Sequence, residues 1–353
     1  VYCPSHPVEI ERVGVRQASL NWTGKRDAQQ RDFLLYVGRS PDDVGFSVLS
    51  HRQPAEEGSF LAVFAPAKRV ESTRALPKDV VYVLDTSGSM EGKKIAQAKA
   101  ALAFGVGKLN EGDRFNVISF SSGTHPFRDN LVAATAETRD AARQWLGGLE
   151  ANGGTAIDEA LRTALGQFTS NRLGIVVFLT DGLPTVGENR PDQIVKNVAR
   201  SNPANARVFV FGVGFDQHVQ FLDQITARTR GAREYITPEQ NIEIVMSRFF
   251  VRIDQPVLTD LRVDWGEGVR DVYPRTLPDL FAGDQLVVAG RYTQAGPRLV
   301  KLHGILRGRS VTYEYEGNLV EKGGVGAVPR LWAKQKVEFL LEEVRLRGET
   351  KEV

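Results

Sequence analysis

Apolar residues follow two contrasting patterns in the middle of the chain. The segments 80–84, 174–180 and 207–213 each consist mainly of a continuous apolar run, which is typical of strands that are buried on both faces. Between the runs, apolar residues recur every three or four positions, as at 93–109 and 157–168, which predicts helices with one buried side. Strands that alternate with helices predict an α/β fold with a doubly wound, mainly parallel sheet and helices on both faces.

The same region contains weaker signals for further elements. We expect strands at 114–120 and 234–236 and helices at 137–149 and 241–251. The flanking regions read differently, because short alternating runs separated by polar, Gly- and Pro-containing turns predict β-rich structure on both sides. One such run, "DFLLYVG", covers 32–38.

Charge and composition exclude several classes of function. The 353 residues include 45 basic and 43 acidic side chains, for a formal net charge of +2, which argues against nucleic acid as a partner. The chain has no long apolar run, so we expect no direct membrane insertion. Cys3 is the single cysteine, which rules out an internal disulfide and cysteine-rich zinc motifs.

The segment "VVYVLDTSGSMEGKK" (80–94) carries the candidate chemistry. Asp85, Ser87 and Ser89 place three oxygen-bearing side chains on one loop between a buried strand and a helix. Such residues often do no more than cap a helix. A phosphate-binding loop is disfavoured, because Lys94 stands where that motif requires Ser or Thr.

Nucleophilic catalysis lacks its partners in this sequence. Neither G-x-S-x-G nor H-E-x-x-H occurs, and the five histidines are scattered. Only His125, in the "THPF" turn, is placed where it could approach the loop. We therefore predict no catalytic residues and no enzymatic activity.

A metal ion explains the loop together with two distant residues. A hard divalent cation takes about six oxygen ligands, so three are not enough. Asp181 directly follows the apolar run at 174–180, and Thr155 precedes a helix in "NGGT". Loops at the carboxyl ends of strands meet at one edge of an open α/β sheet, where such folds bind ligands.

Residues 78–253 resemble the von Willebrand factor type A domain. Its metal-ion-dependent adhesion site reads D-x-S-x-S, then a threonine, then an aspartate, and all five positions match here, at Asp85, Ser87, Ser89, Thr155 and Asp181. The flanks "GGTAIDEAL" and "FLTDGLPTVGE" are similar to the heavy chains of inter-alpha-trypsin inhibitor and their bacterial relatives, and composition favours a bacterial relative.

The resemblance also implies a domain organisation. Residues 1–70 would be part of a β-rich vault/inter-alpha-trypsin domain, and 78–253 the type A domain. Residues 254–329 would form a second β-rich domain, and 330–353 a truncated terminal helix.

The function implied by the resemblance is metal-dependent adhesion outside the cell or in the cell envelope. The five residues would hold Mg2+ (or Mn2+ or Ca2+), and another protein would complete the coordination with an Asp or Glu carboxylate. Two alternatives stay open: a metal-dependent hydrolase, and a structural scaffold with a vestigial site.

Overall fold

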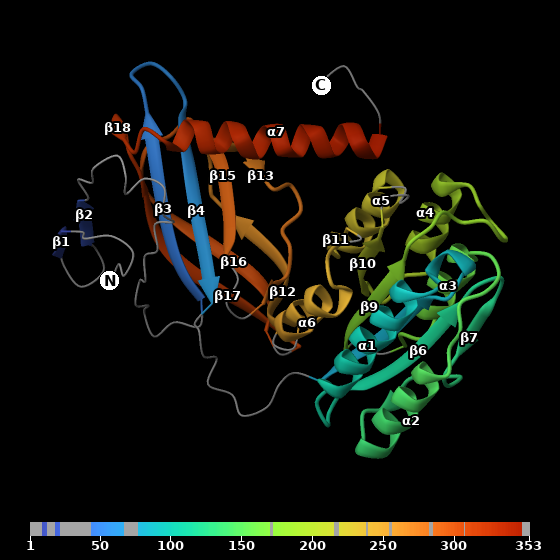
Figure 1. Ribbon diagram of the computed structural model, residues 1–353. Helices are drawn as coiled ribbons and strands as arrows, with labels where there is room; N and C mark the ends of the chain where they lie inside the picture. Colours follow the sequence, from blue (N-terminus) through green and yellow to red (C-terminus); the bar gives the residue numbers. More distant parts are fainter. Residues whose placement is uncertain are drawn as a thin grey trace.

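The computed structural model describes residues 9–12, 18–21, 44–66, 77–169, 172–214, 219–237, 239–253, 256–281, 285–306 and 308–347. An α/β region and a β-rich region lie side by side, and a long helix, α7 (Val328–Arg347), runs above the β-rich region and reaches the edge of the α/β region (Figure 1).

A seven-stranded, mainly parallel sheet forms the α/β region, as the alternation of strands and helices predicts. The order β11–β10–β9–β5–β6 is parallel throughout, and the short strands β7 and β8 pair with β6 in antiparallel fashion. The strands are β5 (Lys78–Asp85), β6 (Arg114–Phe120), β7 (Thr124–Pro126), β8 (Val132–Ala133), β9 (Leu173–Thr180), β10 (Arg207–Val213) and β11 (Arg233–Ile236).

Helices cover both faces of this sheet. Alternate residues of β5 point to opposite sides, so Val80, Tyr82 and Leu84 pack in one core while Val81 and Val83 pack in another. The first core is closed by α1 (Lys93–Gly107), α2 (Ala136–Gly147) and α6 (Ile242–Ile253). The second is closed by α3 (Ile157–Leu165), α4 (Pro191–Arg200) and α5 (Val219–Thr229).

Two of these helices, α4 and α5, are not among the helices predicted individually from sequence. The signal for α4 was present, because Pro191 occupies its first turn and Ile194, Val195 and Val198 lie on one buried face. Both helices carry residues of the core formed with α3.

The β-rich region is a sandwich of two sheets around a third core. One sheet has the order β14–β12–β16–β17, and the other β13–β15–β4–β3–β18. Its strands are β3 (Val44–Arg52), β4 (Gly58–Pro66), β12 (Pro256–Asp264), β13 (Val269–Tyr273), β14 (Leu280–Phe281), β15 (Leu286–Tyr292), β16 (Gly296–Leu306), β17 (Arg309–Leu319) and β18 (Gly323–Gly324).

The sandwich draws strands from both sides of the α/β region. Residues of β4 pair with β15 along its whole length, from Gly58 opposite Tyr292 to Phe64 opposite Leu286. The two β-rich regions that sequence divides at 1–70 and 254–329 therefore share one sheet and one core, because neither set of strands covers its apolar face alone. The exact domain boundaries stay a prediction.

Two further strands near the start, β1 (Glu9–Arg12) and β2 (Ala18–Asn21), form a separate antiparallel pair. The strand expected at 32–38 lies outside the described residues. Among the helices described, none has the length and apolar content needed to cross a membrane.

Candidate metal site

The candidate residues gather where β5 and β9 end. These strands are adjacent and in register, with Leu84 opposite Leu179, so Asp85 and Thr180 follow side by side at the carboxyl edge of the sheet. The loop after Asp85 is anchored by Met90, which has no exposed surface, and by two hydrogen bonds that Thr86 donates to the Phe120 carbonyl. Packing and hydrogen bonds therefore hold this loop against the rest of the domain.

Asp85 is buried, and both carboxylate oxygens accept hydrogen bonds. Oδ1 accepts from the Ser87 amide at 2.8 Å, and Oδ2 accepts from the Thr180 hydroxyl at 2.5 Å. Burial raises the pKa of Asp85 to about 6, although the bonds from Thr180 and Ser87 act to lower it and the Asp181 charge adds to the rise. The carboxylate thus lies in an environment that is short of positive charge.

Ser87, Ser89 and Asp181 form a chain of hydrogen bonds. The two serine hydroxyls are 3.0 Å apart, and Ser89 donates to Asp181 Oδ1 at 2.7 Å. Ser87 and Asp181 are buried, whereas Ser89 between them is exposed, so Ser89 is where the chain meets solvent. The hydrogen bond between Ser89 and Asp181 joins residues that are 92 positions apart in sequence.

Thr155 is presented by a loop that is tied to its neighbours. Its amide donates to the Thr185 hydroxyl at 2.8 Å, and the Thr185 amide donates back to the Thr155 carbonyl at 3.0 Å. The preceding Gly153 has a positive φ of 75°, and its carbonyl accepts from the Gly88 amide at 3.1 Å. The Thr155 loop is thus connected both to the loop after Asp85 and to the loop after Asp181.

The hydroxyls of Ser89 and Thr155 converge in front of Gly182. A Cβ atom placed on Gly182 would lie 3.9 Å from each of these two oxygens. Hydrogen bonds thus link four of the residues singled out from sequence, Asp85, Ser87, Ser89 and Asp181, and the hydroxyl of the fifth, Thr155, lies near Gly182, the residue after Asp181.

Two residues at the site were missed by sequence reasoning. Thr180 binds the buried Asp85, and Lys94 places its ammonium 2.5 Å from Asp181 Oδ2. For Lys94 the only signal was its position two residues after a glycine at a helix start. His125, the one histidine considered for the site, lies on β7 with its side chain exposed.

The donor set suits a hard cation. In the described part of the chain, no three His, Cys, Asp or Glu side chains gather in a way that could hold a metal, so a soft or histidine-rich site is not offered there. The donors that do gather are two carboxylates and three hydroxyls, all oxygen ligands, as Mg2+ prefers.

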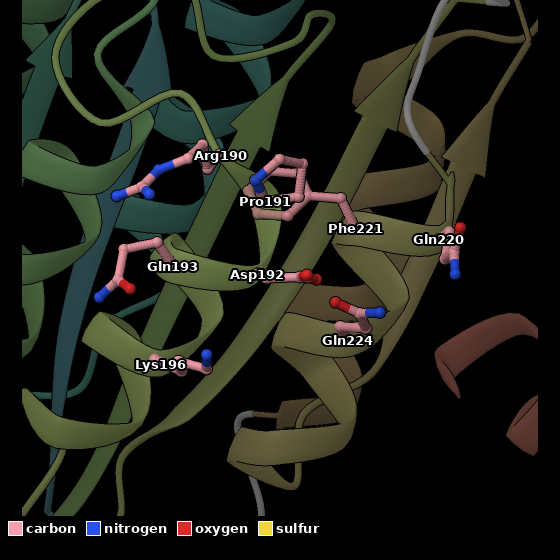
Figure 2. A pocket seen from close by; sticks show the side chains of 8 residues that line it. All are labelled: Arg190, Pro191, Asp192, Gln193, Lys196, Gln220, Phe221 and Gln224. Atoms are coloured by element: carbon pink, nitrogen blue, oxygen red, sulfur yellow. The ribbon is translucent and has the colours of Figure 1, made fainter. Parts of the chain in front are cut away.

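A pocket of about 510 Å3 lies apart from these donors, between α4 and α5 (Figure 2). Its lining residues are Arg190, Pro191, Asp192, Gln193, Lys196, Gln220, Phe221 and Gln224. The Arg190 side chain donates two hydrogen bonds to the Glu188 carboxylate. These hydrogen bonds lower the pKa of Glu188 to about 2. The pocket contains none of the five candidate ligands.

The chain is similar in sequence to known proteins. The family model described as "von Willebrand factor type A domain" matches residues 78–235. Human inter-alpha-trypsin inhibitor heavy chain H4 is 31% identical over 322 residues, and heavy chain H2 of Sus scrofa is 30% identical over 309 residues. These alignments cover 85% and 81% of this chain but only 34% and 32% of the relatives, so the chain spans about a third of their length.

Solved structures agree on the fold. A von Willebrand factor type A protein from Catenulispora acidiphila superposes with a TM-score of 0.61 at 18% identity, covering 79% of this chain and 74% of that one. The ArnB paralog VWA2 from Sulfolobus acidocaldarius has a TM-score of 0.56 at 15% identity, covering 85% and 83%. The bacterial origin stays a prediction. The chain is a von Willebrand factor type A domain protein related to the inter-alpha-trypsin inhibitor heavy chains.

Proposed function

We propose that the type A domain binds a divalent cation, Mg2+ or Mn2+, through the five converging residues and uses it to bind an acidic side chain of another protein. The observation that carries the proposal is the convergence of Ser89, Thr155 and Asp181, which come from three separate loops. A helix cap needs one such residue, not three from distant parts of the chain.

The roles follow from charge. Asp85 and Asp181 supply two negative charges, and Ser87, Ser89 and Thr155 supply neutral oxygens. When bound, the cation supplies a coordination position for an oxygen from outside. A carboxylate at that position makes a direct ionic bond to the cation that a neutral ligand cannot match.

The rim of the site is accessible to a partner. Leu183, two residues beyond Asp181, is 45% exposed, and Ser122 is exposed on the loop between β6 and β7. They belong to the segments 183–189 and 121–127, which we expect to form the rim of the site and to set its specificity. An exposed apolar side chain beside the metal site can pack against a protein partner, whereas a small ion would leave it without an apolar contact.

Binding rather than catalysis is the favoured role. A metal-dependent hydrolase needs a general base beside the ion, whereas the neighbours identified here are Thr180, Thr185 and Lys94. The proposed location, outside the cell or in the cell envelope, rests on the relationship to the heavy chains. It is tested by fractionating the native source.

Thermal unfolding in Mg2+ and in chelator tests the metal site. A ligand at about 100 times its dissociation constant stabilises the folded state by roughly 2.7 kcal/mol, so the two melting curves should separate. Asp85→Ala should abolish the separation. Asp140→Asn, which changes an exposed aspartate on α2, should leave it intact. Coincident wild-type curves at saturating metal would refute the proposal.

Capture from the native source in Mg2+ and in chelator tests the partner. We expect a protein that is retained only with metal, that is also retained in Mn2+, and that is lost with Thr155→Ala while the variant stays folded. Neutralising single acidic residues of that protein should then identify the carboxylate. Retention that survives every such substitution would show that another surface makes the contact.

A further inference from the structure

Lys94 reaches from α1 to the candidate site. Its Nζ lies 2.5 Å from Asp181 Oδ2 and 3.1 Å from the Ser89 carbonyl. The Asp181 side chain is 1% exposed, whereas that of Lys94 is 38% exposed, so the buried carboxylate meets a cation that enters from the surface. A Cβ atom on Gly214, at the end of β10, would lie 3.7 Å from the same nitrogen.

The helix itself gives no reason for this placement. Lys94 is the second residue of α1, where the partial positive charge of the helix terminus disfavours a cation. Ordering a long lysine side chain also removes rotamer freedom. The preceding Lys93 is exposed. The ion pair with Asp181 is therefore the interaction that compensates for holding Lys94 inward.

The ion pair between Lys94 and Asp181 changes the net charge of the site. Asp85 and Asp181 carry two negative charges, and Lys94 reduces the total to one. A bound divalent cation then brings the site to one net positive charge, whereas without Lys94 it would be neutral. Repulsion between like charges at short range also opposes entry of the cation.

We propose that Lys94 is a built-in counter-ion of the metal site, which occupies Asp181 in competition with the divalent cation and leaves the loaded site with a net positive charge that favours an acidic ligand. This inference rests on the proposed function. It makes Lys94 a positioning residue that sets the affinity of the site for metal, and it predicts that the site binds metal less tightly than its five oxygen donors alone would.

Isothermal titration calorimetry with Mn2+ alone is the direct test. Lys94→Met keeps the length of the side chain and removes the charge, so its dissociation constant should fall on the order of tenfold below the wild-type value, given partial screening by solvent. Lys94→Arg keeps the charge and should bind close to wild type. Lys93→Met removes the neighbouring charge from the same helix turn at an exposed position, and it should change the affinity far less.

Thermal unfolding separates this role from a merely structural one. In chelator, Lys94→Met leaves the buried Asp181 without its cation, so the variant should melt below wild type. In saturating Mn2+ the difference should shrink or reverse. A structural role alone would lower the melting temperature equally in both conditions.

The outcomes distinguish this inference from the function on which it rests. Unchanged or weaker Mn2+ binding by Lys94→Met, with wild type binding normally, would overturn the role of Lys94 and leave the metal site standing. Binding by Lys94→Met but not by wild type would show that the ammonium blocks the site completely, which would overturn the proposed function of the native protein and, with it, the role of Lys94 as a counter-ion that only tunes the affinity. If neither protein binds Mn2+, the proposed function fails and the counter-ion role fails with it.

Discussion

At the scale of single residues, Asp85 depends on its neighbours more than on solvent. It has no exposed surface, and Thr180 donates to one of its oxygens while the Ser87 amide donates to the other. A buried carboxylate that loses a donor retains the full penalty of its lost hydration. Thr180 is itself fully buried, so no water can easily take its place.

Replacing Thr180 by valine should therefore destabilise the domain without changing its shape. We expect Thr180→Val to lower the free energy of unfolding by about 1–3 kcal/mol in chelator, because Asp85 Oδ2 loses its donor. Denaturant titration measures the change. Thr180→Ser keeps the hydroxyl and serves as the control. Equal losses in the two variants would mean that the methyl group, not the hydrogen bond, is what matters.

At the scale of elements, close packing of α1 against α6 depends on a glycine. A Cβ atom on Gly105 would lie 2.6 Å from the ring of Phe250, and this ring also packs edge-on against Tyr82 of the central strand at 5.8 Å. The ring is almost completely buried, so it has little room to move. Gly107 on the same helix faces only the flexible end of Arg143.

The two glycines should accordingly respond to alanine in opposite directions. Gly105→Ala should destabilise the domain by roughly 1–3 kcal/mol through overpacking. Gly107→Ala should be neutral or stabilising by up to about 1 kcal/mol, because alanine is the better helix former. Chemical denaturation of both variants provides the comparison. A stabilised Gly105→Ala would show that α6 shifts freely on α1.

At the scale of the whole molecule, a partly buried ion cluster joins the α/β region to the sandwich. Arg207, at the start of β10, binds Asp279 at 2.7 Å and Asp260 at 3.1 Å, and Arg230 also pairs with Asp260. Burial acts to lower the pKa of Arg207, but the two carboxylates outweigh it and raise the value. Phe281 adds an apolar link, since it packs in the core formed with α1 and α6.

Removing the central arginine should weaken the connection between the two regions. Arg207→Met leaves the nearly buried Asp279 without its cation, and we expect a loss of about 3–5 kcal/mol. Calorimetry should then show two transitions in place of one broad transition. Arg143→Ala removes an exposed pair with Asp140 and should cost less than about 1 kcal/mol. Similar effects for both arginines would mean that the cluster does not join the regions.

The local pattern predicted most of the α/β region. Continuous apolar runs predict buried strands such as β5 and β9. Apolar residues that recur with the period of the helical turn predict helices such as α1 and α3. Short strands such as β7 and β8 contain too few residues to show a periodic pattern of apolar and polar positions. The helices α4 and α5 are not among the elements predicted from sequence, although Ile194, Val195 and Val198 give α4 a buried face.

The sequence alone singles out five candidate oxygen donors, because D-x-S-x-S, a threonine after two glycines and an aspartate after an apolar run are all local patterns. Which distant groups lie beside these candidates depends on the folded chain. Lys94 and Asp181 are 87 residues apart, and Thr180 and Asp85 are 95 apart. The same holds for the sandwich, where β4 pairs with β15 across the whole α/β region. Such pairings follow from the global burial of apolar faces and charges, which no local pattern records.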